Sequence, residues 1–167
     1  SHGKIPGRGV FLKRFSDIMA FDVFEAACWK VYLAAPLFSE AECDFNRKVA
    51  DILTGYAMQV HLPQDCGDSE HSRELSIQRE IFEKNVHAIH NADIVVAVID
   101  GADADSGTSW EIGYAFGLGK KIIALRTDFR HVGHNEMVNL MLEQSSVVVN
   151  NIPSLIQALP CPIPIRP

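Results

Sequence analysis

Residues 93–115 read Asp93-Ile-Val-Val-Ala-Val-Ile-Asp100-Gly-Ala-Asp103-Ala-Asp105-Ser-Gly107-Thr-Ser-Trp-Glu111-Ile-Gly113-Tyr-Ala115. The stretch passes from an unbroken apolar segment into an acidic, glycine-containing loop and then into a helix. Such an apolar segment is typical of a central strand in a parallel sheet, buried on both faces. Ligand sites of open α/β sheets form just beyond the carboxyl ends of these strands. We therefore expect acid/base or nucleophilic chemistry at the carboxylates of this stretch, which are Asp100, Asp103, Asp105 and Glu111.

Strand and helix patterns alternate on both sides of this stretch. We expect strands at residues 31–35, 59–62, 94–99, 121–125 and 147–149. We expect helices from a cap at Ser39 to about residue 57 and at residues 72–90, 109–118, 137–142 and 152–159. This alternation predicts parallel pairing with right-handed crossovers. The simplest architecture is an α/β fold built on a flavodoxin-like, doubly wound sheet of five parallel strands.

The chain divides into three parts. Residues 1–29 form an N-terminal extension that begins like a tag remnant, Ser1-His2-Gly3, and continues as a helix at residues 11–28. Residues 30–159 form the domain, since 167 residues suffice for one domain with a substantial core. Residues 160–167 are a proline-rich tail that cannot be helical, because proline breaks the helical hydrogen-bond ladder.

Composition excludes several classes of function. A formal net charge of −6 argues against binding to the phosphate backbone of a nucleic acid. No apolar run is long enough to span a membrane, and charged residues interrupt any apolar core of a secretory signal. The cysteine spacings suit neither a zinc site nor a disulfide framework, so we expect free thiols and a cytoplasmic protein. The cysteines are Cys28, Cys43, Cys66 and Cys161.

The motifs of the common cofactors are missing from the sequence. There is no G-x-G-x-x-G or G-x-x-x-x-G-K-[ST] loop, so dinucleotide-binding and nucleoside-triphosphate hydrolase activities have no support. His87 with His90, and His131 with His134, have a spacing that suits a metal on a helix, but neither pair has a convincing third ligand. We expect no metal and no organic cofactor.

Three residues point to a specific chemistry. Glu111 lies early in its helix, and this position suits a catalytic carboxylate and a helix-capping carboxylate equally well. Gly107 leaves space for a small molecule. Asp105 alone is more often a turn or cap residue, but together with Glu111 it supplies the carboxylate pair that cleavage of a glycosidic bond needs. Tyr32, from the neighbouring strand, can orient the carboxylate of Glu111, although a strand tyrosine is usually core.

Five segments, in this order, resemble the nucleoside 2-deoxyribosyltransferase family across roughly residues 30–149. They are Val31-Tyr-Leu-Ala-Ala-Pro-Leu-Phe38-Ser39, Leu62-Pro-Gln64-Asp65, Asn91-Ala-Asp93-Ile-Val-Val-Ala, Asp105-Ser-Gly107-Thr-Ser-Trp-Glu111-Ile-Gly-Tyr-Ala and Val138-Asn139-Leu-Met141. Each segment alone is a weak signal, and the five in order are fairly specific.

The resemblance implies roles for these residues. Glu111 would be the nucleophile that forms a covalent 2-deoxyribosyl ester, Tyr32 would hold it in place, and Asp105 would contact the substrate and help with proton transfer. Asn139, with Met141 beside it, would reach into a neighbouring subunit's site and bind the 5′-hydroxyl of the sugar. This implies a homo-oligomer with shared active sites. Further substrate contacts would come from Phe38, Gln64, Asp65, Asn85 and Gly107.

Asn85 departs from the family pattern. Many members carry an aspartate here, on the helix before the third strand, that contacts and helps protonate the base. An asparagine can hydrogen-bond a base edge but cannot supply a proton. The general acid therefore stays open between Asp105, Asp65 and a water molecule.

The activity implied by the resemblance is transfer of 2-deoxyribose between nucleobases in nucleoside salvage, with a nucleoside and a free base as partners. Purines are the expected bases, and the sequence leaves open whether pyrimidines are also accepted. One alternative is an N-glycosidase acting on 2-deoxynucleoside 5′-monophosphates. The loop at residues 35–40 disfavours it, because it has no arginine to hold a phosphate and contains an acidic residue. Another alternative is a non-catalytic nucleoside- or nucleotide-binding module, since fold alone does not settle function.

Overall fold

The computed structural model describes residues 28–66, 74–131, 133 and 136–160. The helix expected at residues 11–28 lies outside them up to residue 27, as does the tail from residue 161. The strands are β1 (Lys30–Ala34), β2 (Gln59–His61), β3 (Ile94–Val98), β4 (Lys121–Leu125) and β5 (Val147–Val149). The helices are α1 (Glu40–Thr54), the short 3-10 helix η1 (Pro63–Cys66), α2 (Leu75–Asn91), α3 (Ser106–Gly117), α4 (Leu140–Ser145) and α5 (Ile152–Ala158).

The five strands form one parallel sheet in the order β2-β1-β3-β4-β5. The expected flavodoxin-like α/β fold is therefore confirmed. β3 lies at the centre, and all five of its residues are buried, as an apolar strand covered on both faces should be. The strand order reverses between β1 and β3, and in such sheets the crevice at this point is where ligands bind.

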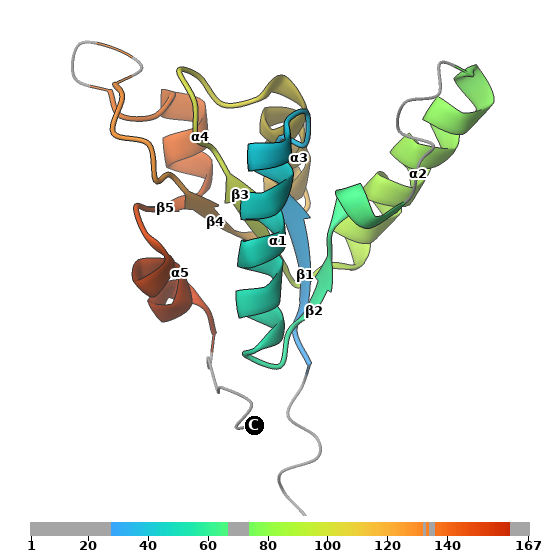
Figure 1. The fold of residues 1–167 in the computed structure, drawn as a ribbon, viewed down its shortest axis with the longest axis horizontal. Helices are drawn as coiled ribbons and strands as arrows, with labels where there is room; N and C mark the ends of the chain where they lie inside the picture. Colours follow the sequence, from blue (N-terminus) through green and yellow to red (C-terminus); the bar gives the residue numbers. More distant parts are fainter. Residues whose placement is uncertain (1–27, 67–73, 132, 134–135, 161–167) are drawn as a thin grey trace, which may run out of the picture.

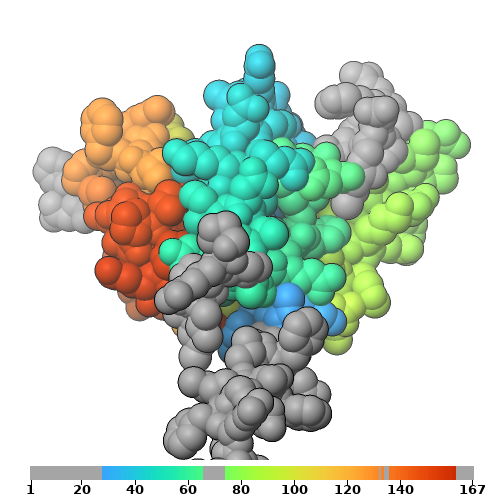
Figure 2. All heavy atoms as spheres, turned by 60° about the horizontal axis from the view of Figure 1, so that its bottom comes forward, coloured from blue at the N-terminus to red at the C-terminus, as the bar shows by residue number. Residues whose placement is uncertain are grey.

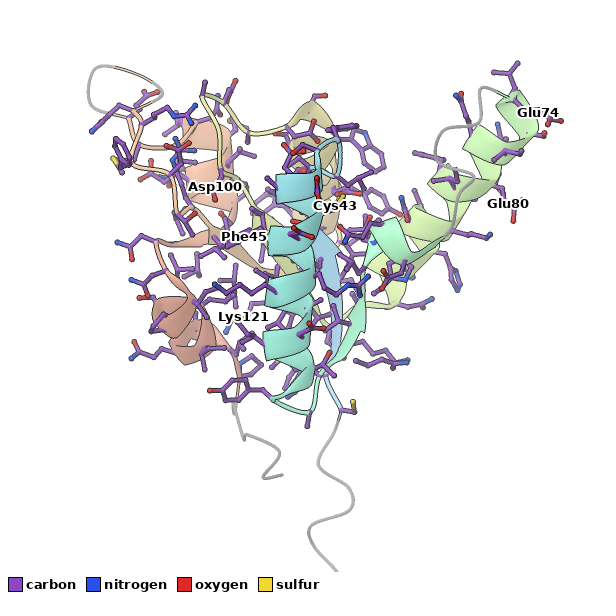
Figure 3. The ribbon with its side chains drawn as sticks, viewed as in Figure 1. Cys43, Phe45, Glu74, Glu80, Asp100 and Lys121 are labelled. Atoms are coloured by element: carbon purple, nitrogen blue, oxygen red, sulfur yellow. The ribbon has the colours of Figure 1, made fainter. Side chains whose placement is uncertain are left out.

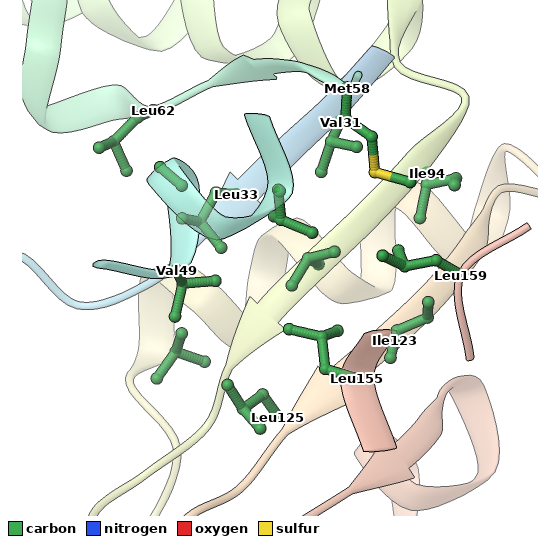
Figure 4. Packing of buried hydrophobic residues seen from close by; sticks show 14 residues of the cluster. Val31, Leu33, Val49, Met58, Leu62, Ile94, Ile123, Leu125, Leu155 and Leu159 are labelled. Atoms are coloured by element: carbon green, nitrogen blue, oxygen red, sulfur yellow. The ribbon is translucent and has the colours of Figure 1, made fainter. Parts of the chain in front are cut away.

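Helices cover both faces of the sheet (Figure 1). On one face α1 and α5 pack on alternate strand residues, and Figure 4 shows Val49 of α1 and Leu155 of α5 among the strand side chains of this core. On the other face Ile89 of α2, Ile112 of α3 and Leu142 of α4 pack on the remaining strand residues. The two layers bury the sheet, which leaves its carboxyl edge as the place for a site.

The first half of α2 projects away from the body of the protein (Figure 1). Leu75 at its start is 83% exposed, and the second half of the helix packs against β1 and α3 through residues such as Ile89. In the space-filling view α2 forms one flank of the molecule (Figure 2). Cavities lie along α2 on the sides that face β1, β2 and α3.

Several helix boundaries differ from the sequence prediction, because capping side chains decide them. α3 begins at Ser106 rather than at residue 109, since the Oδ2 atom of Asp105 accepts the Thr108 N–H at 2.9 Å. α4 begins at Leu140 rather than at residue 137, since the Oδ1 atom of Asn139 accepts the Met141 N–H at 3.0 Å. α1 ends at Thr54, before a tight turn. The expected start of α1 is confirmed by a complete capping box at Ser39.

Arg126 ties together the loops that follow β3 and β4. Its guanidinium is buried and donates to the carbonyl oxygens of Ile99 at 2.7 Å, Gly101 at 3.2 Å and Arg130 at 2.8 Å. Asp100, labelled in Figure 3, accepts the N–H of Asp128 at 2.8 Å and so links the same two loops. These bonds give the carboxyl edge beside the site a fixed backbone. Within the described residues, no helix is long and apolar enough to cross a membrane.

Candidate active site

Glu111 and Tyr32 form a hydrogen-bonded pair at the carboxyl edge of the sheet. Tyr32 is fully buried in β1, and its hydroxyl donates to the Oε1 atom of Glu111 at 2.5 Å. Glu111 lies in the second turn of α3, well inside the helix, so it does not cap the helix; Asp105 does. A short hydrogen bond from a phenol to a carboxylate fixes one carboxylate oxygen and leaves the other available for chemistry.

A cavity of about 340 Å³ adjoins this pair. Its lining residues come from two helices and are almost all apolar or neutral. From α2 they are Phe82, Asn85, Val86 and Ile89, and from α3 they are Gly107, Trp110 and Glu111. This volume is in the range of small-molecule sites, and a mostly apolar lining with a few polar groups is typical of them. Among the residues that the structure describes, Glu111 is the single ionisable one in the lining, and this part of the cavity suits an uncharged ligand.

The environment of Glu111 favours its protonated form. The pKa of Glu111 is raised from 4.5 to about 7. Burial is the main cause, the hydrogen bond from Tyr32 lowers the pKa, and the nearby charge of Asp105 raises it. Because the pKa lies near neutrality, Glu111 exists in both forms at neutral pH. A carboxylate with a strongly shifted pKa that lines a cavity is a candidate catalytic group.

Asp105 shapes the site from the N-terminus of α3. Its Oδ2 atom accepts the Thr108 N–H at 2.9 Å and the Thr108 hydroxyl at 3.2 Å. A Cβ atom at Gly107 would lie 3.1 Å from the same oxygen, so any side chain there would press on Asp105 and narrow the cavity. Asp105 is therefore a helix cap whose charge also acts on Glu111.

The other two carboxylates of the acidic loop have local partners. Asp100 accepts the N–H and hydroxyl of Thr127, both at 2.5 Å, and thereby holds the loop after β4. Asp103 accepts the N–H of Ala104 at 2.9 Å. Asp100 and Asp103 therefore hold loops through these bonds, and Asp105 and Glu111 remain candidates for the chemistry expected of this stretch.

The substrate residues expected after β1 and β2 lie apart from this cavity. The amide of Gln64 contacts α1, since its nitrogen donates to the Cys43 carbonyl at 3.0 Å and its oxygen accepts from Asn46 at 3.2 Å. Asp65 forms a two-pronged ion pair with Arg47, which lowers the pKa of the Asp65 carboxyl. Phe38 is 79% exposed in the loop between β1 and α1. None of the three lines the Glu111 cavity.

Asn85 lines the Glu111 cavity, and Asn139 and Met141 line a different one. Their cavity, of about 400 Å³, meets α3 at Ser106 and Ser109, whereas the Glu111 cavity meets α3 at positions 107, 110 and 111. Met141 is 75% exposed. Within one chain, the structure thus brings Asn85, Gly107 and Asp105 to Glu111 and Tyr32 and keeps Asn139 apart.

The aromatic wall of the cavity went unassigned in the sequence analysis. Trp110, 48% exposed, stacks on Tyr114 with ring centroids 5.3 Å apart, and Phe82 meets Trp110 at 5.6 Å. Phe82, Val86 and Ile89 have the spacing of a buried apolar helix face. This pattern does not show that part of the face borders a cavity. The position of Trp110 directly before Glu111 is the sequence feature from which this aromatic wall could have been predicted.

Comparisons with known proteins show which proteins this chain resembles. A protein of Ureaplasma parvum serovar 3, described as uncharacterized, is 32% identical over 129 residues, which are 68% of this chain and 80% of that protein. A Thermofilum pendens protein provisionally named 2′-deoxynucleoside 5′-phosphate N-hydrolase 1 is 33% identical over 100 residues, which are 58% of this chain and 66% of its own length. The 2-deoxyribosyltransferase of Bacillus psychrosaccharolyticus superposes with a TM-score of 0.64 at 25% identity, over 75% of this chain and 89% of that enzyme.

The fold and the site together define a flavodoxin-like α/β protein with a buried carboxylate–phenol pair beside a small neutral cavity. Residues 31–152 match the profile of the family described as nucleoside 2-deoxyribosyltransferase. The chain belongs to this family, as the sequence resemblance predicted. The family is one of enzymes of glycosyl-transfer and N-glycosidase type.

Proposed function

We propose that the protein transfers 2-deoxyribose between nucleobases, with Glu111 as the nucleophile and a free base as the acceptor. The observation that carries the proposal is the buried Glu111–Tyr32 pair beside a cavity whose described lining residues include no cation. A nucleoside is uncharged and suits such a cavity. The likeness to the Bacillus psychrosaccharolyticus 2-deoxyribosyltransferase supports the same activity.

The mechanism has two halves. In the first, a Glu111 oxygen attacks the anomeric carbon, the N-glycosidic bond breaks, and the base leaves with the bond electrons and takes up a proton. In the second, a nitrogen of another base attacks the same carbon and returns its proton to the group that supplied the first one, the ester bond breaks and Glu111 is restored as a carboxylate. Two displacements retain the configuration of the sugar. Tyr32 donates to the carboxylate throughout and keeps its attacking oxygen aimed at the cavity.

The proton on the departing base needs a source other than Asn85, since an amide has no proton to give. Asp65 is already paired with Arg47 and lies outside the cavity lining. Asp105 acts on Glu111 through its negative charge, so it is a carboxylate with no proton of its own to give. We therefore assign the proton on the departing base to a water molecule that Asp105 positions, and hydrogen bonding of the base edge to Asn85.

We further propose that the active protein is a homo-oligomer. Asn139 and Met141 sit at the mouth of a cavity of their own, on another side of α3 from Glu111. In this position they are available to complete the site of a neighbouring copy. Light scattering tests the proposal: we expect at least a dimer, and an active monomer would contradict a shared site.

A second candidate is hydrolysis of 2-deoxynucleoside 5′-monophosphates, favoured by the similarity to the Thermofilum pendens protein. A phosphate calls for cationic donors, and in the described part of the chain neither arginine nor lysine lines the Glu111 cavity. The transferase therefore fits the site better. The binding-module alternative is weaker still, because a pKa of about 7 on a cavity-lining carboxylate suits catalysis.

The test is base exchange. The protein is incubated with deoxyinosine and adenine, and the products are separated by chromatography. Deoxyadenosine together with hypoxanthine establishes the transferase; hypoxanthine with free deoxyribose indicates a hydrolase instead. Glu111→Gln is the control, and it should abolish exchange while the protein stays folded. Unchanged exchange in this variant would remove Glu111 from the mechanism.

A further inference from the structure

His61 stands behind the tyrosine of the active site. It is the last residue of β2, and in the parallel pairing of β1 with β2 it lies directly opposite Tyr32. Residues opposite each other on neighbouring strands point to the same face of the sheet, so their side chains meet. The two rings are stacked, with centroids 5.4 Å apart and planes 13° from parallel. His61 does not line the Glu111 cavity.

The stack closes the side of Tyr32 that faces the edge of the sheet. β2 is the edge strand, and a groove of about 440 Å³ lies between the second half of α2 and the strands β1 and β2. Half-buried His61 lines this groove, whereas Tyr32 behind it is fully buried. In Figure 2 the first residues of β1 lie between α2 and the segment around β2, where this groove is found. The imidazole therefore separates the tyrosine ring from the open groove.

The orientation of the Tyr32 ring determines whether its hydroxyl meets Glu111. The hydroxyl lies at the far end of the side chain, so even a small tilt of the ring toward the groove moves the oxygen away from the Oε1 atom, now 2.5 Å distant. A ring stacked on the face of Tyr32 blocks this tilt. Misplacement of a reacting group by about 1 Å can lower a rate by on the order of 100-fold.

We propose that His61 is a positioning residue for the reaction, which acts by holding the phenol of Tyr32 against Glu111. The inference rests on the proposed function, in which Glu111 is the nucleophile. His61 does not line the substrate cavity, and the contact that links it to the chemistry is its stack on Tyr32. This role requires a side chain at position 61 with a flat ring that can stack on the ring of Tyr32.

The substitutions that test this role are His61→Ala and His61→Phe. Alanine removes the stack, whereas phenylalanine keeps a flat ring against Tyr32. We expect His61→Ala to lower kcat by about tenfold or more with little change in KM, because the nucleophile is misaligned and the cavity is intact. We expect His61→Phe to restore most of kcat. His87→Ala is the matched control, since His87 lines the same groove on α2, is exposed, and should leave exchange unchanged.

A pH profile separates positioning from a general loss of structure. The hydrogen bond from Tyr32 lowers the pKa of Glu111, so a loosened Tyr32 raises that pKa above about 7 and moves the acid limb of kcat/KM to higher pH. The titratable groups around His61 are Lys30 on β1, Lys84 and His87 on α2, and Asp65 on η1, and they remain in both His61 variants. The limb should therefore move in His61→Ala and stay in place in His61→Phe.

The same shift is measurable without activity, by carbon-13 NMR titration of the Glu111 carboxyl with Glu111→Gln for assignment. If the wild type exchanges bases and both His61 variants match it, the positioning role is refuted and the proposed function stands. If His61→Phe fails as His61→Ala does, a stacked ring is not what the site requires, and the inference is refuted as well. If no glycosyl transfer is found at all, the positioning role is still supported when the pKa of Glu111 is raised in His61→Ala and not in His61→Phe. An unchanged pKa in His61→Ala refutes it.

Discussion

Replacing Glu111 with glutamine should make the protein less active and, above neutral pH, more stable. The pKa of Glu111 is 4.5 in an ordinary setting and about 7 in the folded protein. Between these two values the native protein keeps a proton that the unfolded chain has lost. Native stability is therefore greatest below about pH 4.5 with respect to this group and falls as the pH rises through about 7.

The size of the effect follows from the same two values. One pH unit of difference corresponds to about 1.4 kcal/mol, so the free energy of unfolding should fall by about 3 kcal/mol across this window. Glutamine carries no charge at any pH and removes this loss. Its amide still accepts from Tyr32, and its new N–H group costs about 1–3 kcal/mol if left without a partner, but that cost does not vary with pH. The difference between the variant and the wild type should thus grow with pH in favour of the variant.

Urea unfolding of both proteins between about pH 5 and pH 8 measures this difference directly. Carboxyls with lowered pKa values, such as Asp65 and Asp128, also change stability with pH, but they are present in both proteins and cancel. Glu143→Gln, at an exposed glutamate of α4, is the matched control and should show no such trend. A difference for Glu111→Gln that stays flat across the range would refute the argument that burial holds a proton on Glu111.

Three more predictions concern the site and its frame. Tyr32→Phe removes the hydrogen bond that lowers the pKa of Glu111, so the acid limb of kcat/KM in base exchange should move up by about one pH unit; an unmoved limb would show that the bond does not act on the nucleophile. Asn85→Asp should alter the pH–rate profile or the preference among bases, and identical profiles would exclude it from base contact. Arg126→Met leaves three carbonyl groups without their buried donor. Urea unfolding should show a loss of about 2–4 kcal/mol, and a loss below about 1 kcal/mol would mean that water replaces the guanidinium.

The strands were predictable because burial on both faces leaves a plain pattern in the sequence. The segment at residues 94–98 contains only apolar residues, and in the fold it is the fully buried centre of the sheet. Helix starts were harder, because a single capping side chain sets them. Asp105 and Asn139 each begin a helix through one hydrogen bond to a backbone N–H, and apolar periodicity does not register this.

The pair at the heart of the site could be predicted, and its surroundings could not. Tyr32 lies on β1, and Glu111 lies on the helix that follows β3, the strand beside β1, so the strand order brings the two residues together. Gln64 was expected to face a base, but it bonds to Asn46 and the Cys43 carbonyl. The stack of His61 on Tyr32 depends on the register of two strands to the residue. These contacts join distant parts of the chain, and no local pattern encodes them.

The pairing of Tyr32 with Glu111 also means that the site of the proposed reaction is completed late in folding. The two residues are 79 positions apart, and the strands β1 and β3 must be side by side before α3 can bring the carboxylate to the phenol. Contacts of such long sequence separation form slowly, because a large loop must close first. A nascent chain still on the ribosome that has not yet emerged beyond α3 carries no complete pair. The return of base exchange during refolding would therefore time the closure of the centre of the sheet, and it would lag behind the appearance of helical signal.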